Sequence, residues 1–297
     1  MLNKSIFSII FFLINLSIFG QDEKAQEFIG AISLEDKTVI SYKLTFQDIG
    51  NGKIEGQSIT DFSGDHRTVS KISGQIDYDE NLISFKEVQN LSTKSDYEPD
   101  SFCYIHLNDA KVKLRNRKSI IEGNFTGKFP NGEDCVSGEI KLIGSDFFFN
   151  RMDKLNRKIS RVKKIDSITK INLSSSMFKK KLDANLLEKD DVVALFMKNE
   201  PNLYLEIWDE ELEDGDRIDV YINKSLFLEN YSIKNEKKII KIPFDSEEIS
   251  ITIIANNIGE KAPNTVSLNL RDSQNNHKIR TKLEENEQAY IMVKKDD

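Results

Sequence analysis

Histidine is scarce in this 297-residue chain, which contains only His66, His106 and His277. The sequence also lacks a Gly-x-Ser-x-Gly elbow, a His-Glu-x-x-His zinc motif and a glycine-rich phosphate loop. Carboxylates are abundant, but their number alone does not indicate a glycosidase. We therefore predict that the protein is not an enzyme, with a hydrolase of unrecognised site as an alternative.

Basic residues are also fewer than acidic ones: the chain has 42 Lys and Arg residues and 49 Asp and Glu residues, which gives a net charge of −7. A general nucleic-acid binder needs a basic surface that releases counterions from phosphates. The composition therefore predicts no nucleic-acid partner. The apolar fraction of 38% is that of an ordinary folded protein, and the length allows two domains.

Long hydrophobic runs are absent except at residues 6–19, which follow Lys4. A run of this length is too short to span a bilayer comfortably and is typical of a signal peptide. Gly20 offers a small residue before the cleavage site, so residues 1–20 are the predicted leader; an uncleaved anchor is the alternative. We predict an exported protein (periplasmic, outer-surface or secreted) with no transmembrane segment in the mature chain.

Cysteine occurs only twice, at Cys103 and Cys135. In an exported chain an even pair favours a disulfide, and a nucleophilic thiol would need one of the few histidines beside it. We predict a Cys103–Cys135 bridge within the first domain.

Residues 21–144 alternate between apolar and polar side chains in short runs, as at Tyr42, Leu44 and Phe46. An apolar-x-Gly pattern recurs at residues 54–56, 72–74, 121–123 and 136–138, where glycine inside a strand marks a bend or a close approach. The pattern predicts an antiparallel meander or a barrel of about eight strands. Its interior is either packed or holds a small apolar ligand.

The connecting region differs in composition. In residues 145–165 the apolar residues Met152, Leu155, Ile159 and Val162 recur at helical spacing, among seven basic residues and one acidic residue from position 151 to 164. This predicts a basic amphipathic helix, either a connector packed between domains or a surface for an anionic membrane or acidic partner. Residues 166–201 form an attachment segment, in which 168–173 suggest a strand and Ser174 a helix cap.

Residues 202–297 are expected to form an antiparallel β-sandwich, so that the whole mature chain is predicted to be all-β apart from the connector. The predicted strands are 203–208, 217–222, 226–231, 238–242, 249–255, 266–270, 278–282 and 289–293. The first two are read as a hairpin whose loop, residues 209–216, is acidic at six of eight positions.

Clustered carboxylates on a turn are the oxygen ligands that calcium prefers. Leu212 and Tyr221 occupy two positions where an EF-hand needs ligands, so a calcium site here would be of another type; a solvated turn is the alternative. The candidate metal ligands are Asp209, Glu211, Glu213, Asp214 and Asp216.

If each connection reverses the chain, the acidic loop, the turn near Lys234 and the loop 256–264 fall at one end of the sandwich. Asn256, Asn257 and Asn264 are therefore predicted to form a partner-binding surface with the acidic loop.

The segments Ile207-Trp-Asp, Glu213-Asp-Gly-Asp216, Val220-Tyr-Ile-Asn223 and Pro263-Asn-Thr265 resemble a β-sandwich module that recurs in secreted and envelope proteins of Gram-negative bacteria. The resemblance covers about the last third of the chain and implies an exported, accessory module. The expected function is therefore non-catalytic binding or adhesion at the cell envelope, with a protein, glycan or other envelope component as partner. The alternative is a carrier of small apolar ligands in the first domain.

Overall fold

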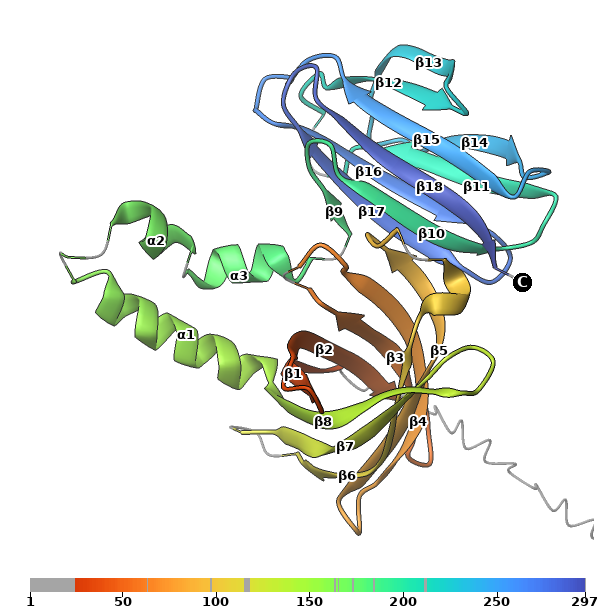
Figure 1. The fold of residues 1–297 in the computed structure, drawn as a ribbon. Helices are drawn as coiled ribbons and strands as arrows, with labels where there is room; N and C mark the ends of the chain where they lie inside the picture. The colour runs from red at the N-terminus through yellow and green to blue at the C-terminus, as the bar shows by residue number, and fades with distance from the viewer. Residues whose placement is uncertain are drawn as a thin grey trace, which may run out of the picture.

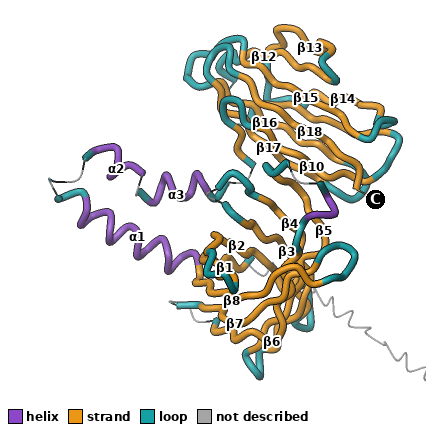
Figure 2. Tube along the Cα trace, viewed as in Figure 1, coloured by secondary structure: helices purple, strands orange, loops and turns teal. Residues whose placement is uncertain are grey.

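The computed structural model describes residues 25–62, 64–96, 98–114, 118–162, 164, 166–172, 174–183, 185–210 and 213–296. The predicted leader lies outside these residues. The all-β prediction is confirmed: Figures 1 and 2 show a barrel, a two-sheet sandwich above it and a helical arm to one side.

The first domain is an eight-stranded antiparallel barrel. Each strand pairs with the next one along the chain, and pairing of β8 with β1 closes the barrel. Its strands are β1 (Gln26–Leu34), β2 (Val39–Asp48), β3 (Lys53–Thr60), β4 (Thr68–Asp77), β5 (Leu82–Thr93), β6 (Tyr104–Lys113), β7 (Ile120–Lys128) and β8 (Asp134–Gly144), with a short 3₁₀ helix at Pro99–Ser101 between β5 and β6.

The barrel interior is filled by side chains. Tyr42, Leu44 and Phe46 alternate inward along β2, as the sequence predicted, and they belong to one cluster of buried apolar residues drawn from all eight strands. The neighbouring residues Lys43 and Thr45 therefore face outward. This packing supports the packed-barrel alternative over a ligand-holding interior.

One carboxylate is enclosed in this interior. Glu87 is 4% exposed, and its Oε1 accepts hydrogen bonds from the Tyr42 hydroxyl at 2.8 Å and the Ser58 hydroxyl at 2.6 Å. Its Oε2 accepts one from the Ile105 amide at 2.8 Å. Burial raises the pKa of Glu87, and these three donors oppose that shift.

Removing one of these donors should destabilise the barrel. We expect Tyr42→Phe to lower the free energy of unfolding by about 1–3 kcal/mol, because a buried carboxylate loses a hydrogen bond that water cannot replace. Urea unfolding followed by circular dichroism measures the change. Tyr78→Phe is the matched control, because the exposed Tyr78 hydroxyl bonds Asp48 in solvent. Equal effects of the two substitutions would contradict the role assigned to the network.

The predicted disulfide is confirmed, since Cys103 and Cys135 are bonded with a Cα–Cα distance of 6.1 Å. The bridge joins the segment before β6 to β8 and passes over Gly127 on β7, which lies between them. A Cβ at position 127 would lie 2.3 Å from the Cys103 sulfur and 2.9 Å from the Cys135 sulfur. Glycine is therefore required where the bridge crosses the strand.

The helical arm contains α1 (Ser145–Ile159), α2 (Ser167–Asn172) and α3 (Ser175–Lys181). The predicted amphipathic helix is confirmed as α1, and Ser174 caps α3 by accepting the Met177 amide at 3.2 Å. The strand predicted at 168–173 is wrong over residues 168–172, because Asp166 accepts the Thr169 amide at 2.8 Å and starts α2; residue 173 lies outside the described residues. Most of the arm extends away from both β domains (Figure 1). Only its base lies beside them, where Lys179 at the end of α3 lines a groove on each domain. Among the described residues, no helix has the length and apolar content to cross a bilayer.

The second domain is a sandwich of two sheets that enclose a separate apolar core. All eight predicted strands are present, preceded by β9 and β10. One sheet contains β13 (Ser225–Ser232), β12 (Arg217–Ile222), β15 (Glu248–Ala255), β18 (Gln288–Asp296) and β10 (Val192–Lys198) in that order; the other contains β14 (Lys238–Pro243), β11 (Asn202–Trp208), β16 (Asn264–Arg271), β17 (Asn276–Leu283) and β9 (Leu186–Leu187).

The sandwich therefore begins before residue 202. Strand β10 pairs in parallel with β18 and supplies Val193, Leu195 and Met197 to the sandwich core. It also pairs with the end of β5 at Thr93, which joins the barrel to the sandwich through one continuous sheet.

The hairpin predicted for residues 203–223 is wrong. Strands β11 and β12 lie in opposite sheets, so the acidic loop crosses from one layer to the other. Both strands have the same alternation because each faces the core from its own side, and alternation alone does not distinguish the two arrangements.

Candidate functional site

Three loops converge at one end of the sandwich, as the alternating directions of the strands predicted. The Asp209 amide donates to Lys234 O at 2.8 Å, and the Asn235 amide donates to Glu213 Oε1 at 2.6 Å. The Glu260 amide donates to Asp214 O at 2.9 Å. We call residues 209–217, 233–237 and 256–265 the loop end.

Asp214 and Asp216 lie at the centre of the loop end. One oxygen of each carboxylate accepts a backbone amide from the facing loop: Asp214 Oδ2 from Lys261 at 3.0 Å, and Asp216 Oδ2 from Thr265 at 2.8 Å. The other oxygen of each, Oδ1, is buried and has no hydrogen-bond donor among the described residues. Buried carboxylate oxygens require a donor, a proton or a cation.

The two free oxygens face the same point of the backbone. A Cβ on Gly259 would lie 2.6 Å from Asp214 Oδ1 and 2.8 Å from Asp216 Oδ1, and Gly259 has a φ of +58°. Glycine therefore keeps this space open. Burial raises the pKa of Asp216 to about 6, and the charges of Asp214 and Asp209 add to that shift.

The three predicted asparagines hold the loops together. Asn257 Oδ1 accepts the Arg217 amide at 2.7 Å, and its Nδ2 donates to Gly215 O at 2.9 Å. Asn256 Nδ2 donates to Asp219 Oδ1 at 2.6 Å. These side chains bond other parts of this chain, so they build the loop end and do not themselves form a free partner surface.

Asn264 is the most enclosed of the three, with 0% exposure. Its Nδ2 donates to Arg217 O and Asn257 O at 3.1 and 2.9 Å. Its Oδ1 is a third buried oxygen without a donor among the described residues. The position predicted to contact a partner is thus an interior position of the loop end.

The four described carboxylates among the five predicted ligands do not form one metal-binding cluster. Glu211 lies outside the described residues, and Glu213 is exposed and bonded to Asn235. In the part of the chain that the structure describes, no group of three or more His, Cys, Asp or Glu side chains could hold a metal. A cation at this end would therefore rest on the Asp214 and Asp216 pair with amide and backbone oxygens.

A groove of about 620 Å³ runs beside Asp209 and Asp214. Its wall is formed by β16, β17 and α3, and residues that the sequence interpretation missed line it: Lys179, Lys261, Thr265, Arg280, Thr281 and Lys282. They come from three separate segments, and only the sandwich topology brings them together. Alternation along β17 was the one available signal, since it places Arg280 and Lys282 on the same face.

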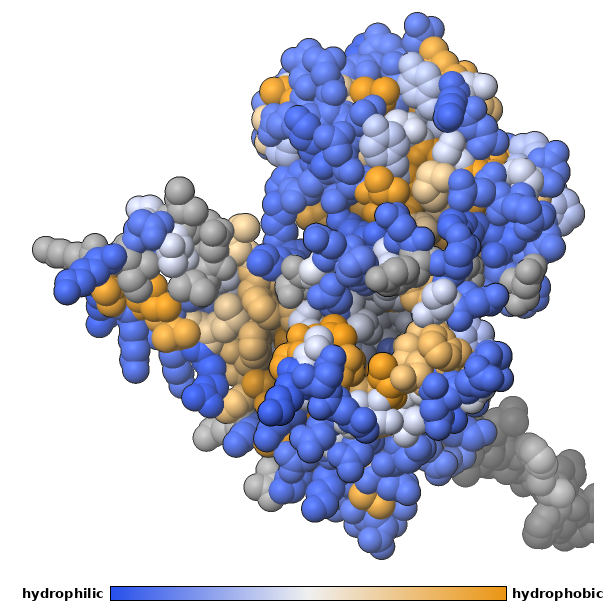
Figure 3. Space-filling view, viewed as in Figure 1, coloured by the Kyte–Doolittle hydropathy of each residue, from blue (hydrophilic) through white to orange (hydrophobic). Residues whose placement is uncertain are grey.

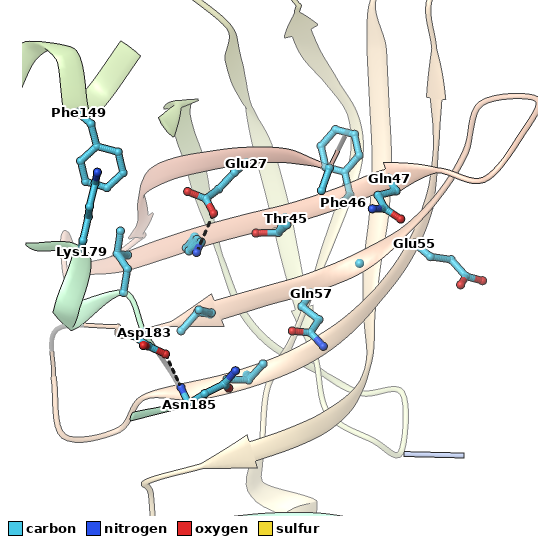
Figure 4. A pocket seen from close by; sticks show the side chains of 16 residues that line it. Glu27, Thr45, Phe46, Gln47, Glu55, Gln57, Phe149, Lys179, Asp183 and Asn185 are labelled. Carbon is cyan, nitrogen blue, oxygen red and sulfur yellow. Dashed lines mark hydrogen bonds and ion pairs between the residues drawn. The ribbon is translucent and has the colours of Figure 1, made fainter. Parts of the chain in front are cut away.

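A second groove, of about 760 Å³, lies on the outer wall of the barrel (Figure 4). Thr45, Gln47 and Gln57 line it from β2 and β3, and Lys179 of α3 lines it beside the Phe149 ring. Its lining mixes these polar and charged side chains with the apolar Ile59, Val69 and Phe149. The groove lies outside the barrel, so it does not support a carrier that holds its ligand in the barrel interior.

Comparisons with protein-family models, with curated proteins and with solved structures found no match. The resemblance of the last third of the chain to an envelope-protein module stays a prediction.

Proposed function

We propose that this protein is an exported, non-catalytic binding protein of the cell envelope, and that the loop end and its groove contact the partner. The observation that carries the proposal is the construction of the loop end. Three loops from separate connections are fixed by side-chain and backbone hydrogen bonds beside an open groove with charged walls. Rigid loops at one end of a sandwich are a common platform for recognition.

Calcium is the proposed organiser of this site. Asp214 Oδ1 and Asp216 Oδ1 beside Gly259 are oxygen ligands of the type that calcium binds, and Asn264 Oδ1 is a further one within the loop end. All three are buried and have no donor among the residues that the structure describes. A bound cation would neutralise two neighbouring carboxylates and fix the loop that carries Lys261 into the groove. A protein, a glycan or another envelope component would then bind the ordered groove.

A hydrolase is the second candidate, because two carboxylates converge and one has a raised pKa. However, Asp216 is only 2% exposed, which leaves no room for a substrate to reach its carboxylate. Cation binding needs far less space, and so the binding function is preferred. Hydrolysis of model glycosides or peptides that is lost in Asp216→Asn would reverse this preference.

Thermal melting tests the cation site. Millimolar calcium should raise the melting temperature by roughly 5–10 °C relative to millimolar EDTA, because a ligand that binds only the folded state stabilises it by mass action. Asp214→Asn/Asp216→Asn should abolish the shift. Asp245→Asn, an exposed carboxylate of the same domain, should keep it. No shift at millimolar calcium in the wild type would exclude the site.

Binding to immobilised envelope polysaccharides and to a glycan array tests the wider proposal. Binding should require calcium and should weaken about tenfold in Lys261→Ala/Lys282→Ala, because both exposed side chains line the groove. Lys238→Ala/Lys241→Ala, at two exposed positions on β14, is the matched control. Equal weakening of binding in both variants would show that the partner does not contact the groove.

A further inference from the structure

The helical arm concentrates positive charge in an acidic protein. Residues 145–183 contain eleven Lys and Arg against four Asp and Glu, whereas the whole chain has a net charge of −7. The remainder of the protein is therefore strongly acidic. Arg151, Lys154, Arg157, Lys158 and Arg161 are all exposed along α1 and just beyond it.

The same arm carries apolar side chains that the protein does not cover. Leu155 and Val162 are 54% and 42% exposed, and they belong to the apolar face that includes Met152 and Ile159. No side chain of α1 is buried. Figure 3 shows apolar atoms on the outer part of the arm, next to strongly hydrophilic ones.

The base of the arm is fixed to the barrel by aromatic contacts. The rings of Phe148 and Phe178 lie 4.9 Å apart, and Phe178 packs edge-on against Phe62 at 5.6 Å. Leu182, which is 6% exposed, joins the same cluster with Ile29 from β1. The arm is thus anchored at its base and extends away from the β domains (Figure 1).

We propose that the arm docks on the surface of an anionic lipid bilayer. Such a surface presents a layer of negative charge above an apolar interior, which matches exposed apolar residues flanked by lysine and arginine. The basic side chains are spread along the arm and are not gathered around one pocket, so they suit a diffuse surface charge better than a single acidic protein segment. The exposed residues that carry this inference lie on α1 and just beyond it, and none of them lines the groove beside the loop end.

Vesicle co-sedimentation tests the inference with the chain from Gln21 onward, because the predicted leader is itself apolar. The vesicles contain phosphatidylcholine alone or mixed with phosphatidylglycerol at a ratio of roughly 3:1. We expect binding to the anionic vesicles alone and its loss at high salt, since the attraction is screened.

Two arm variants separate the contribution of the basic side chains from that of the apolar side chains. Arg157→Glu/Lys158→Glu/Arg161→Glu should weaken binding by at least about tenfold, and Leu155→Ser/Val162→Ser should weaken it by about threefold or more. Lys53→Glu/Lys111→Glu/Lys113→Glu makes the same change of charge at exposed positions on the barrel and should leave binding within about twofold of the wild type. Circular dichroism checks that each variant is folded.

Three results would overturn the inference. They are equal binding to neutral and anionic vesicles, equal weakening by the barrel variant, and sedimentation without vesicles that depends on the arm. The last would identify the arm as a contact between copies of this chain.

Discussion

Asp216→Asn is expected to stabilise the calcium-free protein by about 2–3 kcal/mol at neutral pH. Burial and the charges of Asp214 and Asp209 raise the pKa of Asp216 from 3.8 to about 6. A carboxyl with a higher pKa in the folded state stabilises the fold while it is protonated. That contribution is complete below pH 3.8 and is lost as the pH rises through about 6. Asparagine keeps an oxygen for the Thr265 amide and carries no charge.

Urea unfolding in EDTA, in steps from about pH 4 to about pH 8, measures this effect. The difference between variant and wild type should be small at the acidic end and should reach its full size by neutral pH. Asp245→Asn, with an exposed carboxylate in the same domain, should show little change over that range. In millimolar calcium the wild type should be more stable than the variant, because only the wild type is stabilised by binding the ion. If the variant is less stable than the wild type at neutral pH in EDTA, buried repulsion at this site is refuted.

Removal of the disulfide should have the largest effect on the barrel. Cys103→Ser/Cys135→Ser is expected to lower the free energy of unfolding by about 3–4 kcal/mol, because the bridge closes a loop with a sequence separation of 32 residues and so restricts the unfolded chain. This loop contains β6, β7 and the start of β8, so we expect the loss of stability to fall on this part of the barrel wall.

Two optical probes can locate that loss. Far-ultraviolet circular dichroism reports both domains, whereas the fluorescence of Trp208, the only tryptophan, reports the sandwich. In the double-serine variant the unfolding midpoint measured by circular dichroism should move to a lower urea concentration. The midpoint measured by Trp208 fluorescence should move less. The wild type in dithiothreitol should approach the variant, and the variant should not respond to the reductant. Wild-type unfolding that is insensitive to dithiothreitol would contradict the assigned role of the bridge.

The local pattern of the sequence was sufficient for most strands. The alternation of Tyr42, Leu44 and Phe46 reflects a strand with one buried face, and the same reasoning found all eight strands after residue 202. It failed at residues 168–172, where apolar spacing alone fits helix or strand and the cap at Asp166 starts a helix. It also left β10 unassigned, because this strand is largely apolar and gives no clear period.

The candidate site was only partly predictable. The order of strand reversals placed the three loops at one end, and carboxylates on a turn suggested a cation. The roles of single residues could not be predicted in this way. Asn264, which the strand order places on a surface, is fully enclosed, and no local pattern marks Gly259 as the residue beside the two carboxylates. Which oxygens lack donors depends on which loop folds over which, and that is decided by contacts between residues far apart in the chain.

The sequence by itself determined the all-β class, the disulfide, the amphipathic helix and the shared end of three loops, because these depend on local periodicity, residue type and strand count. The tertiary structure decided that β11 and β12 face each other across the core, that the barrel is packed around Glu87, and that the arm projects outward. It also decided that Asp214 and Asp216 share a buried space beside Gly259. These features arise from long-range packing and burial, which bring together side chains whose separate positions in the sequence carry no sign of their meeting.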